Sequence, residues 1–294
     1  MGRHTRLRHI QTLDPDTDYE EIFQLVTRYE FPWDYNQGYS VAFVTDFLIP
    51  SITQALADGG EFLRHPQKRF DDTMLFPYEA CRAGLESPHG RATLRALNKI
   101  HAHYEIANED YLYILTSHTV WPIRWINTYG WRGLTDTEIR ALVNTNRRMG
   151  RLMGIKDIPA THAEFDAYVR RAEAERAAPH PANRTMARCA LDIIAGMCPA
   201  PTRRLVLSAV TSMIEPANRR ILGLEDPPAW LTPVTHTALR ARGRLVRALP
   251  PRPDDKPFHR TPPSYPAGWT IDHLGPIEYG PYAQHDFPRR KDAP

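Results

Sequence analysis

Residues 98–125, NKIHAHYEIANEDYLYILTSHTVWPIRW, set three histidines and a proline within two helical patterns. In the first pattern Leu94, Leu97 and Tyr104 recur at the three- and four-residue spacing of one helix face, and His101 lies on that same face. His103 points to a different side, where solvent is expected. The spacing therefore predicts that His101 faces the protein interior.

The second pattern carries His118. Tyr111, Ile114 and Leu115 define an apolar stripe, and His118 completes it at the next turn. Pro122 cannot donate a backbone hydrogen bond to the carbonyl of residue 118, and its ring crowds that carbonyl, so a kink is predicted there. Such a kink would open space beside His118, as an inserted ligand or cofactor requires.

Both histidines also have a simpler interpretation. A single histidine on an apolar face is more often a hydrogen-bonded core residue than a metal ligand. Two of them on consecutive, antiparallel helices are more informative together, because buried imidazoles need partners. A metal held between the two facing helices would provide one.

The remainder of the chain also follows helical patterns. Thr17-x-x-Glu20, Thr135-x-x-Glu138 and Thr161-x-x-Glu164 have the form of capping boxes, in which each side chain caps a backbone amide. They predict helices near 18–29, 136–153 and 162–176, and further helical periods lie near 37–57, 69–85, 89–104, 109–129, 184–197, 201–214 and 233–249. No run alternates as a strand would, so the fold class is predicted to be all-α.

The last part of the chain differs in composition. From Pro250 onward lie 11 of the 27 prolines, which excludes regular helix. The aromatic and aliphatic residues of SYPAGWTIDHLGPIEYGPY favour a segment that wraps the body. We therefore expect one helical domain over 1–250 and a proline-rich extension over 251–294 packed on it.

Composition excludes several classes of function. A net charge of +3 in 294 residues, without a concentrated basic stripe, argues against a nucleic-acid partner. The apolar run 39–56 is interrupted by Asp46 and Pro50 and is too short to span a membrane, so it is predicted to be a buried core helix. No apolar segment follows the basic N-terminus as in a secretory signal, and we expect a cytoplasmic protein, either a monomer or a homodimer.

The motifs that are absent narrow the choice of metal. The three cysteines have no C-x-x-C spacing, H-E-x-x-H is absent, and the only Glu-x-x-His, Glu86 to His89, falls in a turn. Haem b held by a histidine remains, because it needs one imidazole, an apolar slot and basic residues for its propionates. The basic residues near the two histidines in sequence are Arg95, Lys99, Arg124 and Arg132.

Several stretches together resemble one family. They are HPQKRFDDT (65–73), RALNKIH (95–101), NEDYLYIL (108–115), PIRW (122–125), GWRGLTDTE (130–138) and YPAGWTIDHLGP (265–276). In this order they are similar to the MpaB-type and rubber-oxygenase superfamily, over residues 10 to 276. The resemblance implies an all-helical fold with a globin-like core around haem b, and attack by O2 on an apolar substrate.

By its position in this resemblance, His118 is the expected iron ligand, with His101 as the alternative. Arg95, Lys99 and His101 then fall on the preceding helix, which faces the distal side. His101 would hydrogen-bond oxygen or act as acid or base, because an imidazole titrates near neutrality. Glu79 is a further candidate base. Arg124 and Arg95 would pair with propionates, and Trp121 and Tyr111 are assigned to the cofactor pocket.

The predicted function is a haem b-dependent oxygenase that uses O2 on a lipophilic small molecule, such as an isoprenoid or another secondary metabolite, with C=C cleavage as one outcome. Two alternatives remain open. One is a non-catalytic haem- or lipid-binding protein. The other is a cofactor-free helical interaction protein, in which both histidines are core residues and the Arg-rich segment 236–249 contacts a partner or a membrane surface.

Overall fold

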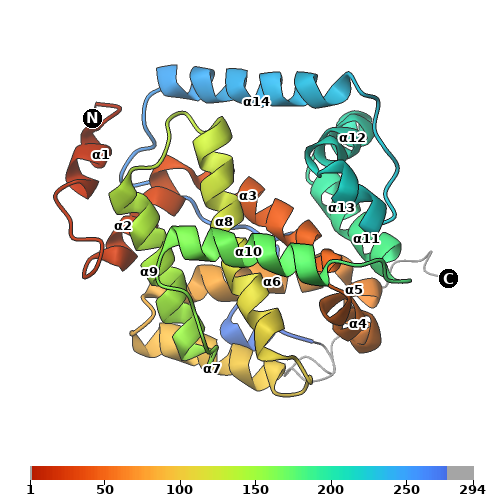
Figure 1. The fold of residues 1–294 in the computed structure, drawn as a ribbon. Coiled ribbons are helices and arrows are strands. Elements are labelled where there is room, and N and C mark those ends of the chain that lie inside the picture. The colour runs from red at the N-terminus through yellow and green to blue at the C-terminus, as the bar shows by residue number, and fades with distance from the viewer. Residues whose placement is uncertain (1, 277–294) are drawn as a thin grey trace.

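The computed structural model describes residues 2–276, in which all regular secondary structure is helical and no strand is present (Figure 1). The predicted all-α fold class is confirmed. The helices, with a π-helix (η1) and 3-10 turns among them, are α1 (Thr5–Ile10), α2 (Tyr19–Leu25), η1 (Val26–Glu30), α3 (Pro32–Thr45), η2 (Asp46–Leu48), α4 (Pro50–Gly59), α5 (Glu61–Arg64), α6 (Pro66–Ala83), α7 (Pro88–His101), α8 (Asn108–Tyr129), α9 (Asp136–Leu152), α10 (His162–Arg176), α11 (Asn183–Gly196), η3 (Ala200–Thr202), α12 (Arg203–Met213), α13 (Pro216–Ile221), α14 (Leu231–Ala248) and η4 (Ile271–His273).

Helix α8 lies at the centre of the packing. It contacts α3, α9, α10 and α14, and most of its residues are buried. It continues as one α-helix through Pro122. At that point α3 approaches closely, because a Cβ added to Gly38 would lie 2.4 Å from the Cα of Pro122. The bare glycine therefore allows the two central helices to touch where the proline lies.

Local sequence signals set the start of two helices, α9 and α10. Thr135 and Thr161 both close capping boxes, with each hydroxyl accepting a backbone N–H at 3.3 Å. The third predicted box, at Thr17, is wrong, because α2 has no side-chain cap. Its partner Glu20 instead accepts the backbone N–H of Leu85 at 2.8 Å, so a tertiary contact has replaced the local one.

The helix expected over 37–57 is two helices. Helices α3 and α4 are bent by 94° across the 3-10 turn η2, and Pro50, which cannot continue a preceding helix, begins α4. Residues 41–49 are all buried, as predicted for a core segment. Within residues 2–276 no single helix has the length and hydropathy of a membrane span, and the only candidate is this bent pair.

Residues 251–276 wrap the helical body, as expected from their composition. The backbone N–H of Phe258 donates to the carbonyl of Arg28 at 2.9 Å. Farther along, Lys68 of α6 donates to the Asp72 carboxylate at 2.7 Å and to the carbonyl of Gly275 at 2.6 Å. This buried ion pair ties the tail to α6. The rest of the predicted extension, 277–294, lies outside the described residues.

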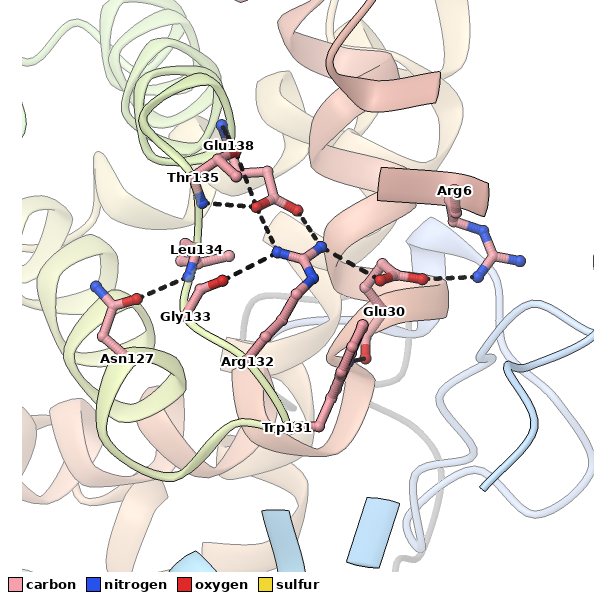
Figure 2. A network of polar contacts seen from close by, with 9 residues as sticks. All are labelled: Arg6, Glu30, Asn127, Trp131, Arg132, Gly133, Leu134, Thr135 and Glu138. Atoms are coloured by element: carbon pink, nitrogen blue, oxygen red, sulfur yellow. Dashed lines mark hydrogen bonds and ion pairs between the residues drawn. The ribbon is translucent and has the colours of Figure 1, made fainter. Parts of the chain in front are cut away.

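A second buried cluster of charges joins α1, the end of η1 and the start of α9 (Figure 2). Arg132 donates to both oxygens of Glu138 at 2.8 and 2.7 Å and to Glu30 at 3.2 Å. Arg6 donates to the other oxygen of Glu30 at 2.9 Å. Both carboxylates are fully buried. The Glu30 carboxylate has these two arginines as partners, whereas Glu138 pairs with Arg132 and also accepts the backbone N–H of Thr135.

Candidate functional site

His101 and His118 line the same cavity, which has a volume of about 200 Å³. Its walls come from helices α3, α4, α6, α7, α8 and α9 and from the last described residues of the tail. The apolar lining includes Phe43, Ile52, Leu56, Phe62, Phe76, Leu97, Ile100, Ile114, Leu115, Met149, Met153 and Ile155. The fold thus brings the two histidines that are 17 positions apart in sequence to one mostly apolar space.

His118 is held by a carboxylate. Its Nε2 lies 2.8 Å from Oδ2 of Asp46, and both side chains are buried. The ring of Tyr39 packs edge-on against the imidazole, with centroids 4.4 Å apart. Burial raises the pKa of Asp46, and the adjacent His118 opposes this rise. Nδ1 of His118 has no hydrogen-bond partner among residues 2–276, so the ring has one nitrogen engaged and one available.

His101 lies at the last residue of α7 and has a different environment. Its ring is 5.1 Å from that of Tyr111, between centroids. Burial, and secondarily the positive charge of Arg69, lowers the pKa of His101 to about 4. The imidazole is therefore neutral at pH 7 and can accept a proton. Arg69 is the one arginine in the described lining, and its guanidinium donates to the hydroxyl of Thr73.

The low pKa of His101 predicts how stability changes with pH. The unfolded chain takes up a proton at this histidine near pH 6.5, whereas the folded protein does so only near pH 4. The free energy of unfolding should therefore fall by up to about 3 kcal/mol as the pH drops through this window. Denaturant titrations should show that His101→Gln removes this loss and that His103→Gln, which alters an exposed histidine two residues away, retains it. Parallel pH profiles for all three proteins would contradict the assignment.

Two predicted catalytic residues, Arg95 and Lys99, lie away from the cavity. Both are on α7 with exposed side chains, six and two residues before His101. Neither is among the residues that line the cavity. We therefore do not retain them in the site.

Arg124 and Trp121 lie on α8 beyond the cavity. Arg124 donates to Oδ1 of Asp166 from Nε and from a terminal nitrogen, at 3.0 and 2.6 Å, and its guanidinium lies 5.1 Å from the Trp121 ring. Both therefore belong to the contact between α8 and α10. Arg132, also near the histidines in sequence, is part of the buried charge cluster in Figure 2. These arginines are thus close to the histidines in sequence but do not line the cavity.

Glu79 is buried on α6 but faces another depression, between α6, α7 and the tail. Burial alone would raise the pKa of its carboxyl group, but hydrogen bonds from Arg82 and His89 outweigh burial and lower it. The carboxylate stays ionised and already has two partners. Its predicted role as a base therefore has no geometric support.

Asp46, Arg69 and Tyr39 were not predicted, and all three line the cavity. A signal for Asp46 was present, because an acidic residue within the apolar run 39–56 must either be solvated or find a buried partner. We interpreted it only as an interruption of a membrane span. Arg69 and Tyr39 carry no comparable signal in the sequence.

Three comparisons with known proteins agree with this architecture. The family described as "ER-bound oxygenase mpaB/B'/Rubber oxygenase, catalytic domain" matches residues 37–248. ER-bound oxygenase mpaB' of Penicillium brevicompactum is 26% identical over 257 residues, and mpaB of the same organism is 26% identical over 264. These matches cover 80% and 82% of this chain but only 60% and 64% of the relatives, so the chain spans less than two thirds of their length.

Among solved structures, latex clearing protein LCP in the closed state superimposes with a TM-score of 0.65. The match covers 84% of this chain and 73% of that protein, at 16% sequence identity. At this identity the similarity establishes a shared fold.

Proposed function

Because this chain belongs to the family of mpaB and rubber-oxygenase catalytic domains, we propose that it is a haem b-dependent oxygenase acting with O2 on a lipophilic small molecule. The observation that carries this proposal is the cavity in which two histidines from different helices meet among apolar side chains. An isoprenoid chain, or another secondary metabolite of similar polarity, fits such a lining. Oxidative cleavage of a C=C bond is the reaction that we favour.

The contacts of His118 support its role as an iron ligand in this proposal. Metal-bound histidines usually place their second ring nitrogen on a carboxylate, which fixes the ring and increases its basicity. Asp46 makes this contact to His118 at 2.8 Å, and the other ring nitrogen has no partner among the described residues. His118 would therefore hold the iron. None of the three cysteines lines the cavity, so a thiolate ligand has no support.

When bound, the haem would supply the iron at which O2 is activated. The chain's own residues would bind the substrate, exclude water and move protons. His101, which lines the cavity, would exchange a proton at one ring nitrogen. Arg69 is placed to pair with an anionic propionate, a task that sequence proximity had suggested for Arg95 and Arg124. The apolar walls would orient the substrate by shape.

The first test is an absorption spectrum of the freshly purified full chain, oxidised and then reduced with and without carbon monoxide, together with haem and iron quantification. We expect a Soret band close to stoichiometric with protein, and a shift with carbon monoxide because a coordination position is open to small ligands. Haem without a carbon monoxide shift would indicate a non-catalytic haem-binding protein. Absence of haem and iron after growth with a haem precursor and after reconstitution would reject the proposal.

The role of Asp46 as a positioning residue gives a separate prediction. Asp46→Asn keeps the size of the side chain but removes the carboxylate that holds His118, so haem affinity should fall by about 10- to 100-fold, as is typical when such a supporting partner is lost. Haem titration of the apoprotein measures this directly. Asp58→Asn, on α4, is a matched control, and unchanged affinity in Asp46→Asn would show that His118 does not need this contact.

A further inference from the structure

Helix α14 lies along one edge of the molecule, across the ends of α8 and α12 (Figure 1). Its inner face is fully engaged with the body. A Cβ added to Gly243 would lie 2.5 Å from the carbonyl oxygen of Tyr129, and Nδ1 of His236 is 2.6 Å from the hydroxyl of the same tyrosine. Leu239 packs beside Trp125. The inner face alone therefore accounts for how α14 attaches to the protein.

The outer face of α14 is apolar as well, although it has no protein partner in the described chain. We use the name outer stripe for six exposed side chains that recur at helical spacing: Trp230, Val234, Ala238, Ala241, Leu245 and Ala248. The exposed fractions of Trp230, Val234 and Leu245 are 60%, 51% and 63%. Apolar side chains of this size are normally exposed singly, so a stripe along a whole helix indicates a binding surface.

The charged residues beside the outer stripe indicate which kind of partner could cover it. Arg240, Arg244 and Arg247 follow one edge of it, all exposed, and none forms an ion pair with another residue of 2–276. Arg242, on the inner side, behaves differently, because it donates to Asp34 at 2.7 Å and lies over the Trp33 ring. From residue 227 to residue 253 the chain contains no Asp or Glu. The outer face is thus apolar and purely cationic.

We propose that the outer stripe of α14 and its flanking arginines bind the surface of an anionic lipid bilayer, with the helix lying in the plane of the interface. A helix of this kind buries its apolar stripe at the boundary between headgroups and acyl chains, while arginines beside it contact anionic headgroups. Trp230, at the start of the helix, is suited to this boundary, because an indole ring has an apolar body and a polar N–H group. The uniform positive charge disfavours a second copy of this face, since two copies would bring their arginines together.

The test is co-sedimentation of the full chain with vesicles of phosphatidylcholine alone and with about 30% phosphatidylserine. We expect binding to the anionic vesicles that weakens in about 0.5 M NaCl, because salt screens exposed charges. The triple variant Arg240→Gln, Arg244→Gln, Arg247→Gln should bind at least about tenfold more weakly. The matched control changes the same number of charges at Arg8, Arg151 and Arg171, which are exposed on α1, α9 and α10, and should bind like the unchanged protein.

The apolar part of the surface is tested by Val234→Asp with Leu245→Asp, which should also lose binding and should remove the blue shift of tryptophan fluorescence that vesicles induce. Melting curves verify that each variant folds. If the aspartate variant does not fold, the vesicle binding of the triple glutamine variant tests the proposal by itself. Equal binding by the triple and its control, or equal binding to neutral vesicles, would overturn the proposal. So would a dimer in sedimentation analysis that the Leu245→Asp change dissociates. None of these readouts uses oxygenase activity, so this inference can fail independently of the proposed function.

Discussion

We expect the His118→Ala protein to purify without haem and without oxygenase turnover, whereas His101→Ala should keep its haem and lose most of its turnover. The reason lies in the two environments. His118 is fixed by Asp46 and offers its second nitrogen to a metal. His101 has no carboxylate partner among residues 2–276 and lines the cavity, where it would transfer a proton. Loss of such a group typically lowers the rate by about 10²- to 10⁴-fold.

The measurements are the Soret absorbance per protein, the iron content, and product formation under O2 with an isoprenoid substrate. His103→Ala is the matched control, because this histidine is only two positions from His101 and its side chain is exposed. Loss of haem in His101→Ala alone would reverse the two roles. Retention of haem in both single variants would show that neither histidine is required to hold it.

Helical periodicity was sufficient to predict that the two histidines face inward, because the spacing of apolar residues fixes which side of a helix is buried. It could not show that both line one cavity, since that depends on how α7 and α8 are placed relative to each other and to α3. Asp46 shows the same limit. Its position in an apolar run indicated a buried acid in need of a partner, but only the packing of α3 against α8 brings it to His118.

The arginines show why closeness in sequence is a weak guide to a cofactor's anionic groups. Arg95 and Arg124 lie near the histidines along the chain, yet one is exposed and the other pairs with Asp166 on α10. Successive residues of a helix point in directions about 100° apart, so a neighbour in sequence usually faces elsewhere. Arg69, in contrast, lies more than 30 residues before His101 in sequence, yet it reaches the cavity from α6.

The structure also shows how two of the stretches on which the family resemblance rests are related in space. The segments 65–73 and 265–276 contact each other, because Asp72 accepts hydrogen bonds from Lys68, from the hydroxyl of Tyr265 and from the backbone N–H of Gly275. The wrapping of the tail was predictable from its composition. Its endpoint on α6, at the rim of the cavity, was not, because it depends on contacts of Lys68, Asp71 and Asp72 with residues that are far away in the sequence.

The second large effect concerns the buried charge cluster of Figure 2. Glu30→Ala should lower the free energy of unfolding by about 3–5 kcal/mol, because it leaves Arg6 and Arg132 without a shared partner while both remain largely buried. In a chain of this length this corresponds to a fall in melting temperature of roughly 6–15 °C. The haem content of the folded protein should not change, since no residue of the cluster lines the cavity.

Denaturant titration of Glu30→Ala should be compared with that of Glu21→Ala, whose carboxylate on α2 is more than half exposed and pairs with the surface residue His9. The control should change stability by no more than about 0.5 kcal/mol. A double variant, Glu30→Leu with Arg6→Met, should recover part of the loss, because apolar replacement of this buried ion pair removes both charges together and leaves Arg132 paired with Glu138. If Glu30→Ala is as stable as Glu21→Ala, water must reach the two arginines, and the cluster does not hold η1 to α9 as its geometry indicates.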